Sequence, residues 1–237
     1  MRKLIGVAAV ATAMLGLTAG ATAQTSELTF KAKATPSDSG TKKKPKNVKV
    51  QFTQTLNKPG TTVEFIDLTL GKGLKMSGKG LGDCTVDDLA FEGPAACAND
   101  KAGPQGKATA LLGADPLNFT IQPFVADSNT LLFYVATEQG SGVSVQSPIT
   151  GEISNGGTKL RIQIPQELRQ PVPGVDASLT GLDQIFSAKK GKKYLISSTG
   201  CTNKKWKFDA KLTFTTRADG AAVPPPVSGS TTAKCKK

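Results

Sequence analysis

Apolar and polar side chains alternate along most of this chain, which is the pattern of strands that bury one face. The longest alternation runs from Trp206 to Phe214, where every second residue is apolar. Similar alternations occupy Leu28–Lys33 and Val48–Thr53. Further strands are predicted at 62–70, 107–112, 118–125, 130–137, 142–153, 159–165, 176–182 and 193–198. No long segment has the 3.6-residue periodicity of an amphipathic helix.

Short strands separated by Gly, Pro, Asn and Asp indicate an all-β domain, and we expect a two-sheet antiparallel β-sandwich. We expect this domain to cover residues 24–218 and to be followed by a Pro/Ser/Lys-rich tail, residues 219–237, which Cys235 ties back. An alternative layout divides the chain into two smaller sandwiches near Gly140–Gly142. The 237 residues are enough for one well-buried core.

One short helix is predicted in the segment CTVDDLAFEGP, which begins at Cys84. Thr85 can cap the first backbone amides while Asp88 reaches back to Thr85, and Gly93 followed by Pro94 ends the turn. Asp87 and Asp88 could also be read as a catalytic carboxylate pair. We favour the capping interpretation, because neighbouring residues on a first helical turn point in different directions and do not flank a substrate.

The first 23 residues have the three parts of a signal peptide. Arg2 and Lys3 are followed by an apolar, uncharged run from Leu4 to Leu17 and then by Ala21-Thr22-Ala23, a small-x-small cleavage site. This apolar run is shorter than the roughly 20 residues that a membrane-spanning helix needs. We therefore expect a secreted protein, extracellular or associated with the cell envelope, with no transmembrane segment in the mature chain.

The chain contains four cysteines, which in an exported protein most simply form two disulfides. Three pairings are possible. Proximity along the sequence favours Cys84 with Cys97, and Cys201 with Cys235. The first of these bonds would staple the short helix to the sheet.

The stretch GLKMSGKG, from Gly73 to Gly80, comes close to a phosphate-binding loop. In that motif a Ser or Thr follows the lysine and the loop leads directly into a helix. Here Gly80 follows Lys79, and the next residues, Leu81-Gly82-Asp83, do not begin a helix. We interpret this stretch as a turn-rich connection that leads from a strand into the disulfide-bound helix.

The absence of histidine excludes Ser-His-Asp and Cys-His catalysis as well as zinc sites built on imidazole. A carboxylate pair or a Ser-Lys arrangement would remain, but neither has a local signature. Glu64, Asp67, Glu138 and Glu152 lie in predicted strands and could meet in a cleft, although solvent-facing strand positions explain them as well. We expect a non-catalytic protein with no cofactor and no metal site.

Lysine carries most of the positive charge, and the whole chain has a formal net charge of +12. Many of these lysines gather in four clusters: Lys42–Lys44 with Lys46; Lys189, Lys190, Lys192 and Lys193; Lys204, Lys205 and Lys207; and Lys234, Lys236 and Lys237. The candidate anion-binding residues are Lys189, Lys190, Lys192, Lys193, Lys204 and Lys205. Lysine is a hydrated point charge, whereas specific reading of nucleic acid bases favours arginine.

The lysines therefore predict adhesion to an anionic cell-wall or extracellular polymer, without specific recognition of nucleic acid. The simpler interpretation is that they keep a secreted β protein soluble and protect its edge strands. A further alternative is a carbohydrate-directed enzyme or sugar-binding domain. Exposed aromatic platforms would be expected there, but the single Trp, Trp206, alternates with polar residues in a way that places it in the core.

Several segments together resemble a group of uncharacterised exported β-rich proteins of high-GC Gram-positive soil bacteria. The resemblance is carried by GLKMSGKGLGDC, GPAAC, GPQGKATALLG, NTLLFYV, LRIQIPQELRQPVPGVDASLTGLD and GCTNKKWKF. It covers most of the mature chain and implies the compartment and the layout, because that group has no assigned activity. Members of the group tend to have proline after the second cysteine, where this chain has Ala98.

Overall fold

The computed structural model describes residues 27–57, 60–140 and 142–236, and its main element is one eleven-stranded sheet. Its strands, in spatial order, are β1 (Leu28–Thr35), β3 (Lys49–Leu56), β11 (Ala177–Phe186), β6 (Gly106–Leu112), β7 (Asp115–Val125), β8 (Thr130–Thr137), β9 (Gln146–Ser154), β10 (Lys159–Gln163), β4 (Thr62–Leu70), β15 (Lys205–Thr215) and β16 (Val227–Lys234). Every neighbouring pair in this order is antiparallel.

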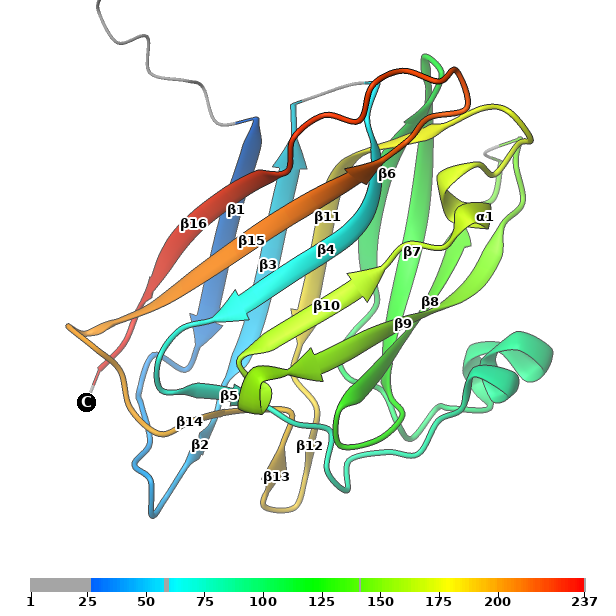
Figure 1. Cartoon of the computed structure of the whole chain (residues 1–237). Coiled ribbons are helices and arrows are strands. Elements are labelled where there is room, and N and C mark those ends of the chain that lie inside the picture. Colours follow the sequence, from blue (N-terminus) through cyan, green and yellow to red (C-terminus); the bar gives the residue numbers. More distant parts are fainter. Residues whose placement is uncertain (1–26, 58–59, 141, 237) are drawn as a thin grey trace, which may run out of the picture.

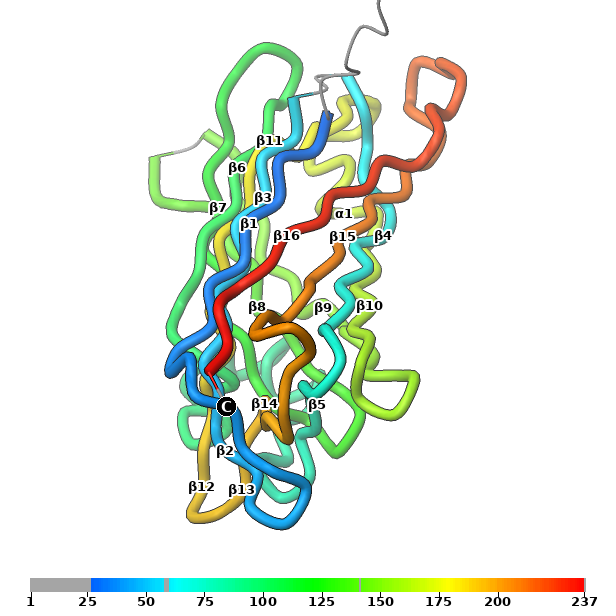
Figure 2. Tube along the Cα trace, turned by 90° about the vertical axis from the view of Figure 1, so that its left-hand side faces the viewer, coloured from blue at the N-terminus to red at the C-terminus, as the bar shows by residue number. Residues whose placement is uncertain are grey.

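The sheet curves until its two edge strands, β1 and β16, lie side by side, so that it is nearly a barrel (Figures 1 and 2). Gly229 of β16 approaches β1 so closely that a Cβ atom there would lie 2.7 Å from the Cβ of Phe30. Just beyond the two strands, the Lys236 amide donates to the Ser37 carbonyl at 2.7 Å, and the Ser39 amide donates to the Lys236 carbonyl at 2.7 Å. The approach shields both edges, which would otherwise be open to pairing with another chain.

The core lies inside this curved sheet and is built from the inward residues of its strands. Along β15 the alternation predicted from the sequence holds, because Trp206, Phe208, Ala210, Leu212 and Phe214 are all buried. Phe52 of β3 lies near the centre of the aromatic packing, with ring centroids 5.7 to 6.0 Å from those of Phe30, Phe186 and Phe208. Period-two alternation thus determines which side of each strand faces the core.

Two small sheets close the end of the barrel that lies lowest in Figure 1. β2 (Lys46–Asn47), β14 (Ile196–Ser198) and β5 (Leu74–Met76) pair in that order, and β12 (Lys189–Lys190) pairs with β13 (Lys193–Tyr194) as a short hairpin. At the opposite end, the short helix α1 (Gln166–Arg169) packs against β4 and β11. A further helical turn, η3 (Asn155–Gly157), connects β9 to β10.

The predicted capping box is confirmed. The Thr85 amide donates to Asp88 Oδ2 at 3.0 Å, and the Asp88 amide donates to Thr85 Oγ1 at 3.1 Å. The helical turns that follow are η1 (Asp88–Glu92) and η2 (Gly93–Ala95). The hydrogen bonds from Thr85 lower the pKa of the Asp88 carboxyl. Both preferred disulfides are also confirmed, Cys84–Cys97 and Cys201–Cys235.

The Cys84–Cys97 bond holds these turns on the outer face of the barrel, as predicted. Leu89 and the two sulfurs pack there against Phe124 of β7 and Leu132 of β8, in a hydrophobic cluster separate from the barrel core. The Cys84 amide also donates to the Val125 carbonyl at 3.2 Å. β7 and β8 are therefore buried on both faces at this point.

The prediction of an all-β antiparallel fold is confirmed, and the bounds 62–70 and 130–137 are reproduced by β4 and β8. The division into two sheets is not confirmed, because the eleven strands of the main sheet are hydrogen-bonded to one another in one continuous order. The alternative split at Gly140–Gly142 does not occur. The strands on either side, β8 and β9, pair with each other, and the Thr137 amide donates to the Val145 carbonyl at 3.0 Å.

The tail predicted at 219–237 requires a correction, because Val227–Lys234 form β16 and pair with β15 from Leu212 to Lys205. The segment contains few apolar residues, so its alternation is invisible in the sequence. It is held instead by backbone pairing with β15 and, as expected, by the Cys235 disulfide. The predicted signal peptide, residues 1–23, lies outside the described residues.

Candidate anion-binding surface

Four segments that are distant in the sequence meet at the end of the barrel closed by β2, β5 and β14. We call this surface the lysine-rich end and define it as residues 36–47, 71–82, 187–205 and 234–236. β14 pairs with both β2 and β5, which joins the first three segments. The Cys201–Cys235 bond and the hydrogen bonds of Lys236 with Ser37 and Ser39 attach the fourth.

The lysine-rich end carries fifteen lysines and one carboxylate, Asp38, and these fifteen make up half of the chain's 30 Lys and Arg residues. All fifteen side chains are exposed. No salt bridge among the described residues involves any of them. Such an uncompensated group of charges raises the local concentration of anions and speeds their association.

The structure places the six predicted anion-binding lysines in two parts of this end. Lys189 and Lys190 form β12 and Lys193 begins β13, with Lys192 in the turn between them. Lys205 is the first residue of β15 and Lys204 precedes it, where the Lys204 carbonyl accepts a hydrogen bond from the Cys235 amide at 2.8 Å. Lys42–Lys44 and Lys46, in the segment before and within β2, and Lys234 and Lys236, at the end of β16, join them. Lys237 lies outside the described residues.

Three lysines of this surface were not predicted from the sequence as anion-binding residues: Lys72, Lys75 and Lys79. Lys75 and Lys79 belong to the glycine-rich stretch Gly73–Gly80, considered above as a phosphate loop, and Lys72 directly precedes it. Leu74–Met76 form β5, which pairs with β14, and the segment from Leu81 to Thr85 is not helical. The Thr199 amide donates to the Gly73 carbonyl at 2.8 Å and the Ser77 amide to the Leu195 carbonyl at 2.9 Å, so the stretch is bound along its length to the 187–205 segment.

The backbone conformation at Gly80 lets the glycine-rich stretch 73–80 lie close to the β12–β13 hairpin. Gly80 has a φ of +65°, and the Lys193 ammonium lies against it where a Cβ atom would stand. The Nζ of Lys189 lies 6.0 Å from the centroid of the Tyr194 ring, at the outer limit of a cation–π contact. The hairpin thus presents lysines around one half-buried aromatic ring.

Carboxylates border the lysine-rich end on one side. Burial raises the pKa of the Asp100 carboxyl and the neighbouring Asp83 charge raises it further, whereas the positive charge of Lys190 acts in the opposite direction. Acidic residues therefore begin next to the β12–β13 hairpin, on the side of the Cys84–Cys97 loop. A polyanion would contact the hairpin from the side away from these carboxylates.

The four strand carboxylates considered as a catalytic group do not form one. Arg161 of β10 lies opposite Glu152 of β9 and opposite Asp67 of β4, and its Nε is 3.7 Å from Asp67 Oδ1. Glu138 pairs instead with Lys107, at 3.6 Å. Within the described part of the chain, no group of three or more His, Cys, Asp or Glu side chains could hold a metal ion.

Trp206 is fully buried, as its alternation predicted, and its Nε1 donates to the Gly200 carbonyl at 2.8 Å. Trp206 is therefore part of the core, and its hydrogen bond holds the connection that precedes β15. Of the helices in the described ranges, none has the length and apolar character required to cross a bilayer.

Comparison with known proteins adds little to this description. No family model matches the chain, and no curated protein matches it. A solved structure described as "AvmM Catalyzes Macrocyclization in Alchivemycin A Biosynthesis" is similar over 90% of this chain and 91% of that one, at 8% sequence identity and a TM-score of 0.29. At that TM-score the likeness carries no argument about fold or activity.

Proposed function

We propose that this chain is a secreted, non-catalytic binding module whose lysine-rich end adheres to an anionic polymer of the cell envelope or the extracellular space. The observation that carries the proposal is the meeting of four separate lysine segments, with fifteen exposed lysines and one carboxylate, on one end of the barrel. Solubility alone would be served as well by lysines spread over the whole surface.

The chemistry of the surface suits a flexible polymer with repeated phosphate or carboxylate groups. Lysine ammonium groups act as point charges that tolerate many ligand geometries, whereas arginine would select planar, bidentate partners. No arginine lies in the four segments. We therefore propose a ligand recognised by its charge density and not by its sequence or stereochemistry.

Secretion is part of the same proposal. The described structure contains two disulfides, and disulfides persist in oxidising compartments. The predicted signal peptide would deliver the chain to such a compartment, where wall polymers carry dense negative charge. The alternative of a sugar-binding or sugar-cleaving protein has less support, because Trp206, the one tryptophan, is buried.

The test is binding of the mature protein to an immobilised glycerol-phosphate polymer at increasing salt concentration. The affinity should fall steeply between about 50 and 200 mM salt, because bound lysines release counterions from the polymer. A variant with Lys189, Lys190, Lys192 and Lys193 all changed to Gln should bind more weakly at every salt concentration.

The matched control changes four exposed lysines on the barrel wall, Lys31, Lys107, Lys159 and Lys211, to Gln. It removes the same net charge from outside the lysine-rich end, so its binding should stay near that of the unmodified protein. Equal losses in both variants, or binding that does not depend on salt, would contradict the proposal. A salt-independent rise in melting temperature with a neutral glycan would favour the sugar-binding alternative.

A further inference from the structure

Apolar side chains stand exposed on the helical turns η1 and η2, which project from the barrel wall (Figure 1). The Phe91 side chain is 86% exposed, more than any other large hydrophobic residue of the described chain, and Val86 is 46% exposed. Ala90, Ala95 and Ala96 of the same turns are exposed as well. The apolar surface here is therefore larger than one isolated ring, as is typical of a surface that a partner covers.

The fold holds Phe91 in this outward position. Leu89 is 1% exposed and packs with the Cys84–Cys97 sulfurs against Phe124 on the barrel wall. Phe91 follows Leu89 by two residues, about half a helical turn, so it points away from the wall. The side that faces the wall is thus occupied, and only a partner from outside can bury the Phe91 ring.

The segment around Phe91 is acidic. We call residues 83–100 the acidic knob, which contains five carboxylates and neither lysine nor arginine. The five are Asp83, Asp87, Asp88, Glu92 and Asp100. No salt bridge within the described structure involves any of them. An exposed apolar surface with uncompensated negative charge is complementary to a basic partner.

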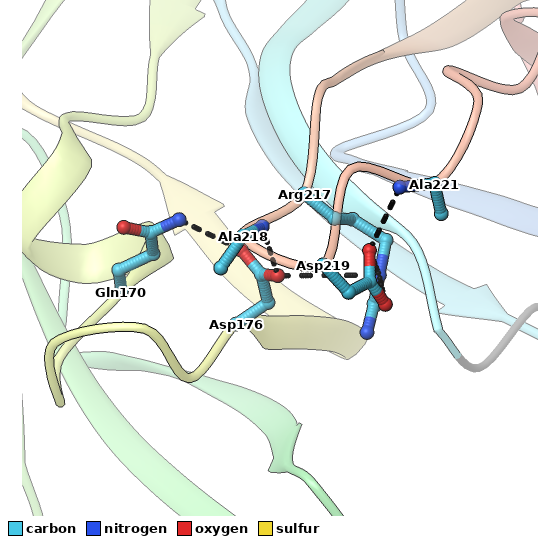
Figure 3. Close-up of polar contacts among 6 residues, drawn as sticks. All are labelled: Gln170, Asp176, Arg217, Ala218, Asp219 and Ala221. Atoms are coloured by element: carbon cyan, nitrogen blue, oxygen red, sulfur yellow. Dashed lines mark hydrogen bonds and ion pairs between the residues drawn. The ribbon is translucent and has the colours of Figure 1, made fainter.

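The carboxylates at the opposite end of the barrel are, by contrast, compensated within the chain. The Nε of Arg217 lies 3.1 Å from Asp219 Oδ2 and 3.9 Å from Asp176 Oδ2 (Figure 3). Asp176 also accepts hydrogen bonds from the Ala218 amide at 2.8 Å and from Gln170 Nε2 at 3.1 Å. The negative charge of the acidic knob has no such internal use.

The acidic knob borders the lysine-rich end of the same molecule. The Lys193 ammonium lies against Gly80, and two residues further on a Cβ atom at Gly82 would lie 2.7 Å from the Asp100 Cβ. Lys190 is near enough for its charge to act on the Asp100 carboxyl. One molecule therefore presents a basic surface beside an acidic one, and two such copies can pair both surfaces at once about a two-fold axis.

We propose that the acidic knob docks on the lysine-rich end of a second copy of this chain, with each copy contributing both surfaces. Phe91 would lie against the β12–β13 hairpin, where Tyr194 is a half-buried ring among lysines. Aromatic rings pack favourably with one another and with lysine ammonium groups. Reciprocal contact doubles the buried area, which favours a stable dimer because stable interfaces bury about 800 Å² of each partner.

The experiment is sedimentation equilibrium of the mature protein without polymer, so it goes beyond the polymer binding proposed above and does not rest on it. At about 150 mM salt, charges more than about 8 Å apart are screened, which suppresses the general repulsion between two positively charged copies. A reversible dimer is expected. Phe91→Ser should weaken it tenfold or more, whereas Val223→Ser, which changes a 48% exposed residue outside both surfaces, should alter it by less than about twofold.

A complementary pair of charge reversals tests which surfaces meet. The first variant carries Asp87→Lys with Glu92→Lys in the acidic knob, and the second carries Lys189→Glu with Lys192→Glu in the hairpin. Each variant alone should be monomeric, because its knob and its hairpin then have charges of the same sign. An equimolar mixture should form a heterodimer, because both contacts then join opposite charges.

The matched control is Asp115→Lys with Glu152→Lys, which changes the net charge as the knob variant does but at exposed positions on the barrel wall. It should dimerise like the unmodified protein, and circular dichroism should show every variant folded. A protein that stays monomeric up to about 1 mM would overturn the proposal. So would a dimer that Phe91→Ser leaves unchanged, or a mixture of the two reversed variants that forms no heterodimer.

Discussion

Lys205 of β15 lies directly opposite Lys234 of β16 in the antiparallel register, close to the Cys201–Cys235 disulfide. Like charges in facing positions destabilise a strand pair. The pair therefore acts against the stability of the last two strands, and the disulfide that follows it holds them together. This arrangement is expected where a surface carries positive charge for binding and not for folding.

Replacing Lys205 by Glu should separate these two effects. The new carboxylate faces Lys234, so we expect the free energy of unfolding to rise by a few tenths to about 1 kcal/mol. Binding to the glycerol-phosphate polymer should become weaker, because the lysine-rich end loses two units of charge. Urea denaturation and salt titration measure the two quantities, with Lys205→Gln as the intermediate case. A variant that is both less stable and unchanged in binding would contradict the role given to this residue.

The two disulfides should differ in their effect on binding. Changing Cys201 and Cys235 to Ser should lower the free energy of unfolding by about 4 kcal/mol, and changing Cys84 and Cys97 to Ser by about 3 kcal/mol, since the loops they close differ in length. The first change also frees the end of β16, where Lys234 and Lys236 lie. It should reduce polymer binding under conditions in which the protein remains folded.

The Cys84–Cys97 variant is the control for that experiment. Its disulfide holds the helical turns against Phe124 and Leu132 on the outer barrel wall, and none of the fifteen lysines lies between its two cysteines. Its polymer binding should therefore match that of the unmodified protein. Thermal unfolding followed by circular dichroism, together with the binding assay, checks both variants. A loss of binding in the Cys84–Cys97 variant alone would count against the assignment of the surface.

Trp206→Phe should destabilise the fold by about 1–3 kcal/mol. The substitution leaves a void in a fully buried position and removes the hydrogen bond from Trp206 Nε1 to the Gly200 carbonyl. The variant lacks tryptophan, so urea unfolding should be followed by circular dichroism instead of fluorescence. A change below about 0.5 kcal/mol would show that the connection around Gly200 is held without this side chain.

Asp209 gives a prediction about pH. Burial of its carboxyl acts to raise the pKa, but hydrogen bonds from Ser230 and Lys207 and the charge of Lys207, at 2.9 Å, prevail and lower it. Because the pKa is lower in the folded state, the ionised carboxyl stabilises the fold fully above its unfolded value of about 3.9. That contribution declines as the pH falls further and is lost below the folded pKa.

Asp209→Asn should therefore be less stable than the unmodified protein at pH 7 by a few tenths to about 1 kcal/mol, a range suited to a partly exposed pair. The difference should shrink as the pH is lowered below about 3.9. Denaturation curves at several pH values from 2 to 7 measure it. A difference that stays constant over this range would show that the titration of Asp209 does not contribute.

The sequence by itself determined the local features of this protein. Period-two alternation places Trp206 and Phe208 inside and Lys207 outside whatever the sheet's final shape, because strand pleating alone requires it. The Thr85–Asp88 capping box needs only residues within one helical turn. The preferred disulfides follow from proximity along the chain in an oxidising compartment.

Only the tertiary structure decided how these parts are joined. An alternating strand has the same sequence pattern in a sandwich and in a closed sheet, because pairing partners are set by backbone hydrogen bonds that carry no side-chain signal. For this reason β16, with its few apolar residues, was predicted as a tail, and Lys72, Lys75 and Lys79 were not recognised as part of a basic surface. Four lysine clusters become one surface only when strands far apart in sequence pack together.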